Sequence, residues 1–311
     1  MQNQRKIFVR ILLAIFLLGA TLLVFRNARD YLKDGSELVH QSTEKKLKRL
    51  HRWIPDHTAL VTVLDLNLIR ADTFLSALLS DVMRRDSFAN GVVQPFLEST
   101  DIGMLAVIAH YDEADKPQAA VVMQGAFDPD QLKKMIEEAA TAEGITLEKH
   151  DVGKAEIYFE KESEAPLAFA FLDRAHWAIG SHDVILKLFS DIPKKSLFQQ
   201  KGNAFLFGRI LFVPRLQKIL PHQFASLHEA RFFSNDGKQL QAEVPCSSFE
   251  EVEALKLFLS GFKSLLLLQH QDNPSITSVL NSTVLFSEGT TFQMTADLSP
   301  LIALWGHGLP K

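Results

Sequence analysis

Ala59-Leu-Val-Thr-Val-Leu-Asp-Leu66 is the stretch on which the fold prediction depends. It is apolar and rich in β-branched residues, which is typical of a buried strand. Asn67 follows it and is a good helix N-cap, so we expect a helix from there through Asp81. Pro55-Asp56 precedes it and ends a polar, basic segment. The chain after Pro55 is therefore expected to be globular.

Downstream of this strand the first half of the globular part alternates strand-like and helix-like segments. Asp112 to Pro117 is a polar turn between two apolar runs, which indicates a hairpin. Asp128-Pro129 supplies an N-cap and a first-turn proline for an amphipathic helix that ends at Gly144. The expected strands are 59–66, 103–111, 118–126, 155–159, 167–172 and 177–180, and the expected helices follow 67, 128 and 181.

The second half is predicted to repeat this order. Ser248-Phe-Glu-Glu251 is a capping box that opens a long helix to about Gln269, and Asn235-Asp236-Gly237 is a hairpin turn. The expected strands are 203–211, 229–234, 239–244, 283–287 and 290–296, and the expected helices are 213–227, 248–269 and 300–305. Both halves thus predict the order β-α-β-β-α-β-β-α. The predicted fold class is α+β, with two similar lobes of mainly antiparallel sheet at 55–195 and 196–311.

Upstream of the strand, residues 7–25 are apolar apart from Arg10 and contain no proline. This length suits a transmembrane helix, and Arg10 lies near its end, where it can reach the headgroups. We expect a cytoplasmic tail and transmembrane helix over 1–27. A cleaved signal peptide is the alternative, but the apolar run continues past Ala20, which favours an uncleaved anchor.

Positive charges flank the predicted span on both sides, so they do not decide its orientation alone. A long C-terminal domain translocates largely regardless of charge, which favours a cytoplasmic N-terminus. The expected location is the bacterial inner membrane, with the C-terminal domain outside the cytoplasm. Residues 28–54 are polar and basic, and we expect a solvated helical stalk, with a face lying on headgroups or a partner helix as the alternative.

Composition excludes several classes of protein. Hydrophobic residues make up 47% of the 311 residues, which excludes a wholly disordered chain. The single Cys246 excludes an internal disulfide and a Cys-based zinc site. The net charge of -4 gives no general attraction for nucleic acid, so no nucleic-acid partner is expected.

No established catalytic, cofactor or metal motif occurs in the sequence, so no catalytic, cofactor-binding or metal residues are predicted. Three weaker patterns have structural interpretations. His110 and Asp112 share a strand face but form only two ligands, which is typical of a solvated hairpin. Ser181-His182-Asp183 cannot form a triad from adjacent residues, and Ser181 is interpreted as a helix cap. Cys246 precedes a helix N-terminus, which would stabilise a thiolate, and His222 or His228 is the candidate catalytic partner near it in the fold. A lone thiol is more often inert, and this is the preferred interpretation.

The segment Val252 to Leu268 is apolar on nearly every side of the predicted helix. We expect it to be buried between the two lobes; the alternative is that part of it docks a partner protein. The candidate partner-binding residues are Leu257, Leu265, Leu267 and Leu268.

Three short patterns resemble a family of uncharacterised, membrane-anchored bacterial proteins. They are Ile54-Pro-Asp-x-x-Ala-x-Val-x-Val-Leu-Asp-Leu66, Gly125-x-Phe-Asp128 and Phe286-Ser-Glu-Gly-Thr-Thr291. The resemblance spans about residues 54 to 298 and implies duplicated α+β modules outside the cytoplasm. It implies no catalytic residues.

The function predicted from these features is a single-pass, membrane-anchored interaction or scaffold module, an accessory subunit of a membrane-associated assembly. Its expected partners are the lipid bilayer, through residues 7–25, and other membrane or extracytoplasmic proteins. No cofactor is expected, and the protein is predicted not to be an enzyme. The alternative is a membrane-tethered hydrolase or metal-dependent enzyme with a site at the lobe boundary.

Overall fold

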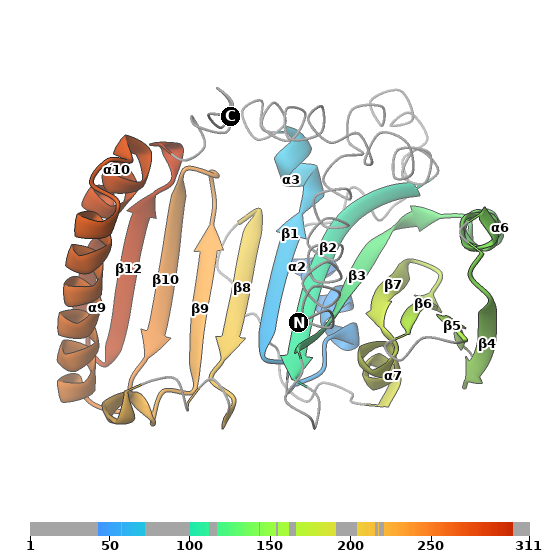
Figure 1. The fold of residues 1–311 in the computed structure, drawn as a ribbon, viewed down its shortest axis with the longest axis horizontal. Helices are drawn as coiled ribbons and strands as arrows, with labels where there is room; N and C mark the ends of the chain where they lie inside the picture. Colours follow the sequence, from blue (N-terminus) through green and yellow to red (C-terminus); the bar gives the residue numbers. More distant parts are fainter. Residues whose placement is uncertain are drawn as a thin grey trace. The chain divides into compact units, whose positions relative to one another are not determined.

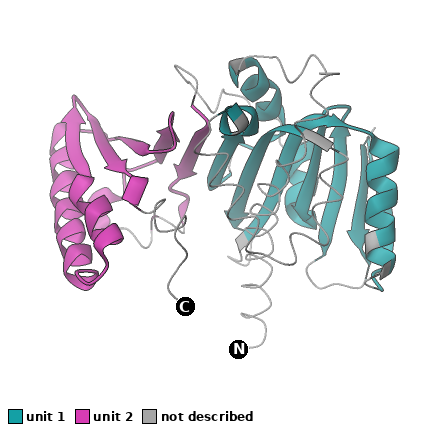
Figure 2. Cartoon of the chain, turned by 90° about the horizontal axis from the view of Figure 1, so that it is seen from above, with its two compact units in different colours: residues 1–201 teal, residues 202–311 magenta. Residues whose placement is uncertain are grey.

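The computed structural model describes residues 43–56, 58–71, 100–111, 117–142, 144–153, 155–161, 166–190, 204–214, 217 and 221–300. The chain divides into two compact units, residues 1–201 and 202–311 (Figure 2). The predicted transmembrane helix at 7–25 and the predicted stalk up to residue 42 lie outside the described residues. Among the residues that are described, no helix combines the length and apolarity needed to cross a bilayer.

The first unit has seven strands in its described part, and each pairs antiparallel with its neighbours in the order β1-β2-β3-β7-β6-β5-β4 (Figure 1). The strands are β1 (Leu60–Asp65), β2 (Thr100–Tyr111), β3 (Pro117–Phe127), β4 (Leu147–Val152), β5 (Ala155–Glu160), β6 (Leu167–Asp173) and β7 (His176–Ser181). The helices are α2 (Thr43–Leu50), the 3-10 turn η3 (His51–Trp53), α3 (Leu66–Ala71), α6 (Pro129–Ala142) and α7 (His182–Ser190).

Helices cover both faces of the first sheet. On one face, Lys46 of α2 meets Asp65 of β1, and Lys187 of α7 lies 2.7 Å from His110 of β2. On the other face, the Nζ atom of Lys133 in α6 lies 5.1 Å from the centre of the Tyr158 ring in β5. Because successive strand residues point to opposite faces, the central strands β1, β2 and β3 contribute apolar side chains to both packed layers.

The segment leading into β1 is part of this unit rather than a free stalk. Leu47, Leu50 and Ile54 are buried, with exposures of 6%, 0% and 0%. Asp65 is fully buried and its carboxylate accepts a hydrogen bond of 2.7 Å from the hydroxyl of Thr43. The predicted solvated helical stalk is therefore wrong for residues 43–54, because the spacing of its few apolar residues suits docking onto the sheet.

The second unit has five strands in its described part, in the order β11-β12-β10-β9-β8, again with antiparallel pairing. The strands are β8 (Leu206–Leu211), β9 (Glu229–Ser234), β10 (Gln239–Pro245), β11 (Val284–Glu288) and β12 (Thr291–Asp297). The helices are the 3-10 turn η5 (His222–Phe224), α9 (Phe249–Gln269) and α10 (Pro274–Ser282). Helix α9 runs alongside these strands (Figure 1).

The core of the second unit lies between α9 and one face of the sheet. Val252 and Leu255 of α9 pack with Phe224, Val244 and Phe292 in one buried cluster. The ring of Phe258 lies 5.3 Å from that of Phe224, edge to face. Burial of this apolar surface, rather than helix propensity, holds α9 in place.

The predicted fold class is wrong. The structure is mostly antiparallel β sheet with few helices in the described residues, and its two units do not repeat the order β-α-β-β-α-β-β-α. In the first unit, β4 adds a strand whose residues Lys149, His150 and Asp151 are too polar to show a buried strand pattern. In the second, Asn273 caps a separate helix, α10, between α9 and β11.

Candidate functional site

Helix α9 carries most of the exposed large hydrophobic residues in the described part of the chain. Six of the ten exposed large hydrophobic residues there belong to this helix. They are Leu257 (73% exposed), Leu268 (70%), Phe249 (57%), Phe262 (50%), Leu265 (50%) and Phe258 (41%). We call Leu257, Gly261, Leu265 and Leu268, which follow one another at helical spacing, the α9 outer face.

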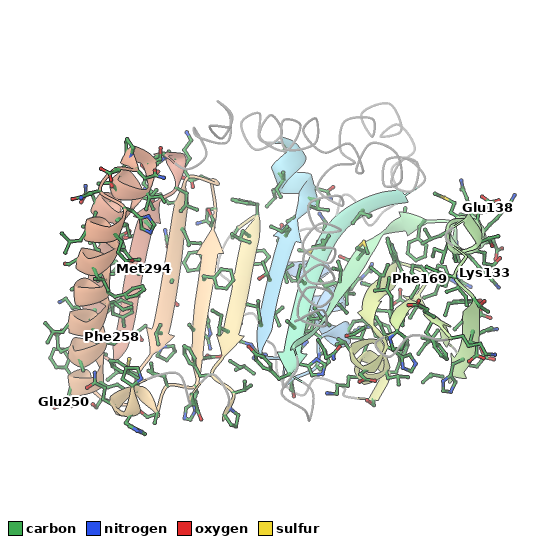
Figure 3. The ribbon with its side chains drawn as sticks, in the orientation of Figure 1. Lys133, Glu138, Phe169, Glu250, Phe258 and Met294 are labelled. Carbon is green, nitrogen blue, oxygen red and sulfur yellow. The ribbon has the colours of Figure 1, made fainter. Side chains whose placement is uncertain are left out.

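The helix is apolar on two sides for a simple geometric reason. Val252 and Leu255 point to the sheet and are buried, whereas Leu257 and Leu268 lie roughly half a turn away. In Figure 3 the labelled Phe258 lies on α9 and Met294 on the neighbouring strand β12, which marks the packed side. An amphipathic surface helix would carry polar residues opposite this side. Here Leu257 and Leu268 occupy two of those positions, and the small residues Ser260, Gly261 and Ser264 lie between them.

The two lysines of α9 do not offset this apolar character. The Nζ atom of Lys256 lies 3.7 Å from Glu253, and that of Lys263 donates a hydrogen bond of 2.7 Å to the backbone oxygen of Thr283. Lys263 is the one charged residue between Leu257 and Leu268, and it turns toward its own unit. The α9 outer face therefore carries no charge between Leu257 and Leu268, and the acidic residues Glu250 and Glu253 precede it on the same side of the helix.

The start of α9 is fixed by a buried carboxylate. Glu251 accepts hydrogen bonds from the backbone N–H of Ser247 (2.6 Å) and from the hydroxyls of Ser247 (2.7 Å) and Ser226. The hydroxyl of Ser248 accepts from the N–H of Glu251 (3.2 Å), which confirms the predicted N-cap. Burial raises the pKa of Glu251, but these hydrogen bonds outweigh it and hold the pKa below its ordinary value. Helix α9 is thereby held at a defined angle to the unit.

The exposed apolar area on α9 is divided between its outer face and its flanks. With about 200 Å² for a fully exposed large apolar residue, the three leucines of the α9 outer face correspond to roughly 400 Å², and the three phenylalanines toward the flanks add about 300 Å². The largest apolar patch on a typical monomer measures about 300–600 Å², and larger ones mark interaction sites. The α9 outer face alone thus matches the largest apolar patch of a typical monomer, and such patches are often functional.

Apolar exposure continues onto the edge strand β11. Val284 is 56% exposed and Phe286 is 39% exposed. Leu285 packs toward the cluster beneath α9, so by alternation Val284 and Phe286 lie on the opposite face of the sheet. Strand β11 pairs with β12 and has no second strand neighbour in the described part of the chain. Its outward backbone groups therefore form an open edge.

The outermost strand of the first unit differs sharply. The ammonium of Lys149 in β4 pairs with Glu156 and, at 3.2 Å, with Asp151, and these partners raise the pKa of Lys149 to about 12. Charged edge strands of this kind resist pairing with other chains. Strand β11 carries no such protection apart from Glu288 at its end.

The predicted partner-binding residues fall into two groups. Leu257, Leu265 and Leu268 are exposed on the α9 outer face, and Leu267 is half-buried. The preferred sequence interpretation, burial of this segment between two lobes, is wrong for the three exposed leucines. Phe249, Phe262, Val284 and Phe286 were not predicted as binding residues, although the alternation of β11 was a usable signal.

The other sequence patterns do not assemble a reactive site. The imidazole of His110 meets Lys187, and Asp112 lies outside the described residues. The hydroxyl of Ser181 donates to the backbone oxygen of Ala119 (3.3 Å) rather than capping α7. Burial lowers the pKa of His182, whose ring lies 4.6 Å from that of Phe159. His182 thus belongs to the packing of α7 against the sheet.

Cys246 does not have the features of a nucleophile. Its thiol donates to the backbone oxygen of Val244 at 3.5 Å. Burial and the nearby Glu251 carboxylate raise its pKa, so the thiolate is disfavoured. No cluster of three or more metal-ligating side chains occurs within the described ranges.

Sequence reasoning missed a buried polar cluster in the first unit. His176 is 3% exposed; its Nδ1 lies 2.8 Å from the Asp173 carboxylate and its Nε2 lies 3.0 Å from the Gln124 amide nitrogen. A ring with its proton on Nδ1 donates to Asp173 and accepts from Gln124. Burial raises the pKa of Asp173, but the bond to His176 leaves it below its ordinary value. Because both ring nitrogens are engaged, His176 joins β3, β6 and β7 rather than acting on a substrate.

Comparison with known proteins returned no match to a family model, a curated protein or a solved structure. The resemblance of residues 54–298 to membrane-anchored bacterial proteins is therefore untested and stays a prediction. The exposed surface of the chain is therefore the basis for its proposed function.

Proposed function

We propose that this protein is a single-pass, membrane-anchored interaction module, an accessory subunit of a membrane-associated assembly. The observation that carries the proposal is the uncharged α9 outer face, with Leu257 and Leu268 at 73% and 70% exposure. Exposure of these apolar side chains to water costs free energy. Docking to another protein buries them and removes that cost.

The membrane part of the proposal rests on sequence. Residues 7–25 have the length and apolarity of a bilayer-spanning helix, and we propose that they contact lipid, with the C-terminal part outside the cytoplasm of a bacterial cell. Because residues 43–54 pack onto the first unit, residues 26–42 form the whole connection to the proposed anchor. Such a short tether confines the module to the membrane surface and raises its effective concentration for neighbours there.

The test uses the full chain expressed in its own membrane and extracted in mild detergent. The wild-type protein is expected to migrate as a stoichiometric complex, and the double variant Leu257→Glu/Leu265→Glu as a single chain. Leu167→Glu is the matched control, because Leu167 is 44% exposed but belongs to the first unit. Extraction of the wild-type protein as a lone monomer would refute the proposal.

The membrane arrangement has its own test. Protease added outside intact spheroplasts is expected to digest the globular units while the protein stays in the membrane fraction after carbonate washing. Recovery of the protein in the soluble fraction, or full protection from the protease, would contradict the proposed anchor or its orientation.

A further inference from the structure

We propose that the basic outer side of α2 lies on the anionic headgroups of the membrane and thereby fixes the orientation of the first unit at the bilayer surface. This inference rests on the anchor at residues 7–25 that the proposed function includes, and it does not involve the partner at the α9 outer face. Its carrying observation is that the exposed residues of α2 and η3 with described side chains are all cations.

Four cations form this side of the helix, which we call the α2 basic face. They are Lys45, Lys48, Arg49 and Arg52, and all four are exposed. Their spacing places them on one side of α2 and of the 3-10 turn η3 that continues it. The sequence from Lys45 to Ile54 contains no acidic residue. The α2 basic face is therefore a continuous stripe of positive charge.

The opposite side of the same helix is fixed to the sheet. Leu47 and Leu50 are buried, and the ammonium of Lys46 lies 3.7 Å from the buried carboxylate of Asp65. The hydroxyl of Thr43 donates to that carboxylate as well, at 2.7 Å. Because α2 is held in this way, the α2 basic face moves with the first unit. A surface that binds these cations therefore sets the orientation of the whole unit.

The α2 basic face has no counter-charge among the residues that the structure describes. None of its four side chains forms an ion pair with them. By contrast, Lys134 of α6 pairs with Glu138 (3.8 Å), and Lys161 after β5 pairs with Glu148. Like charges at helical spacing repel one another, and an anionic surface offsets this repulsion.

The place of α2 in the chain selects a membrane as the source of the negative charge. Residues 26–42 connect the proposed anchor to α2, and a chain of 17 residues spans at most about 60 Å. The α2 basic face is thus held near the headgroups at a high effective concentration. Each Lys or Arg close to an anionic bilayer strengthens binding by about fivefold.

The composition of the α2 basic face also fits headgroups better than a partner protein. Protein interfaces have an apolar or aromatic core and are depleted in lysine. The described side chains of α2 and η3 include no exposed apolar residue, since Leu47 and Leu50 are buried and Trp53 is half-buried. Such a surface gains little from burial against protein, whereas it gains from each phosphate that it approaches.

Chemical labelling in vesicles tests the contact directly. The full chain is reconstituted into vesicles of phosphatidylcholine, with or without phosphatidylglycerol, and its amines are modified with an uncharged reagent and located by mass spectrometry. Lys45 and Lys48 are expected to react at least about tenfold more slowly in the anionic vesicles, and high salt should abolish this protection by screening the charges. Lys134, on the helix that covers the other face of the sheet, is the internal control and should react equally in both.

The variant Arg49→Gln/Arg52→Gln tests the role of charge, because it leaves both reporting lysines in place. Loss of two cations is expected to weaken the contact by about 25-fold and to restore the labelling of Lys45 and Lys48 in anionic vesicles. Both arginines are exposed, so the unfolding transition should not change. Lys134→Gln is the matched control and should keep the wild-type protection.

The outcomes separate this inference from the proposed anchor. If the chain stays with the vesicles after carbonate washing but Lys45 and Lys48 react equally in the two lipids, the inference is overturned and the anchor stands. If carbonate releases the chain from both kinds of vesicle, the anchor and the inference are both overturned. If the two lysines are protected in native membranes but not in anionic vesicles of the purified chain, the α2 basic face binds an acidic protein, and the lipid contact is refuted.

Discussion

The buried pair of Lys46 and Asp65 should contribute unequally to stability when each residue is replaced alone. The Nζ atom of Lys46 lies 3.7 Å from the Asp65 carboxylate, and their side chains are 5% and 0% exposed. The carboxylate also accepts from Thr43 (2.7 Å) and from the backbone N–H groups of Asn67 (3.1 Å) and Leu68 (3.3 Å). Asp65 therefore has partners besides the ammonium.

The magnitudes follow from what each substitution leaves behind. Asp65→Ala removes the anion, leaves the ammonium of Lys46 buried, and removes the cap of α3, so we expect a loss of about 3–5 kcal/mol. Lys46→Met removes an attraction of about 4 kcal/mol at an effective dielectric constant of 20, but also the cost of burying the ammonium. The carboxylate keeps its three hydrogen bonds, so the expected net loss is about 1–2 kcal/mol.

Urea unfolding followed by tryptophan fluorescence provides the measurement, because Trp53 and Trp177 both lie in the first unit. Limited proteolysis at the basic residues of α2 gives a second readout, since undocking of this helix exposes them. An equal loss of unfolding free energy for Lys46→Met and Asp65→Ala would contradict this prediction. A loss below about 1 kcal/mol for Asp65→Ala would also contradict it.

Three further predictions concern the second unit. The folded-state pKa of Glu251 lies below its unfolded value, so its stabilisation should be complete above about pH 4.3 and should be lost as the pH falls through the folded pKa. Glu251→Gln should remove this dependence and cost about 1.5–3 kcal/mol at pH 7 in denaturant unfolding; an unchanged pH profile would contradict it. A Cβ at Gly208 would lie 1.9 Å from the ring of Phe232, so Gly208→Ala should destabilise by about 1–3 kcal/mol. Gly261→Ala, on an exposed helix with open space around it, should instead stabilise by about 1 kcal/mol, and thermal unfolding of both variants would expose an error in sign.

The parts of the structure that sequence predicts are those that local chemistry determines. The β-branched run at Leu60–Asp65 forms a strand, and Asp128 caps α6 through its bonds to Asp130 and Gln131, as expected. Gly144 ends that region with a φ of 69°, a conformation that glycine adopts without strain. Each of these features depends on a few adjacent residues.

The parts that sequence does not predict depend on contacts between distant segments. Asp65 rather than Asn67 caps α3, because the carboxylate is also held by Thr43. The docking of α2 depends on Leu47 and Leu50 meeting a sheet that begins ten residues later, and a short basic helix does not reveal such a contact. The bonds of His176 to Asp173 and Gln124 likewise depend on strand order.

The same distinction applies to the surface of α9 within its own unit. An apolar helix indicates burial on every side, but in its own unit α9 packs onto the sheet by one side, on which Val252 and Leu255 are buried. Substitutions at a residue as exposed as Leu257 change stability by about 0.5 kcal/mol or less, so folding does not require leucine there. Leu257→Glu should therefore leave the unfolding transition unchanged while it abolishes association. Loss of folding in that variant would show instead that the outer leucines serve the core.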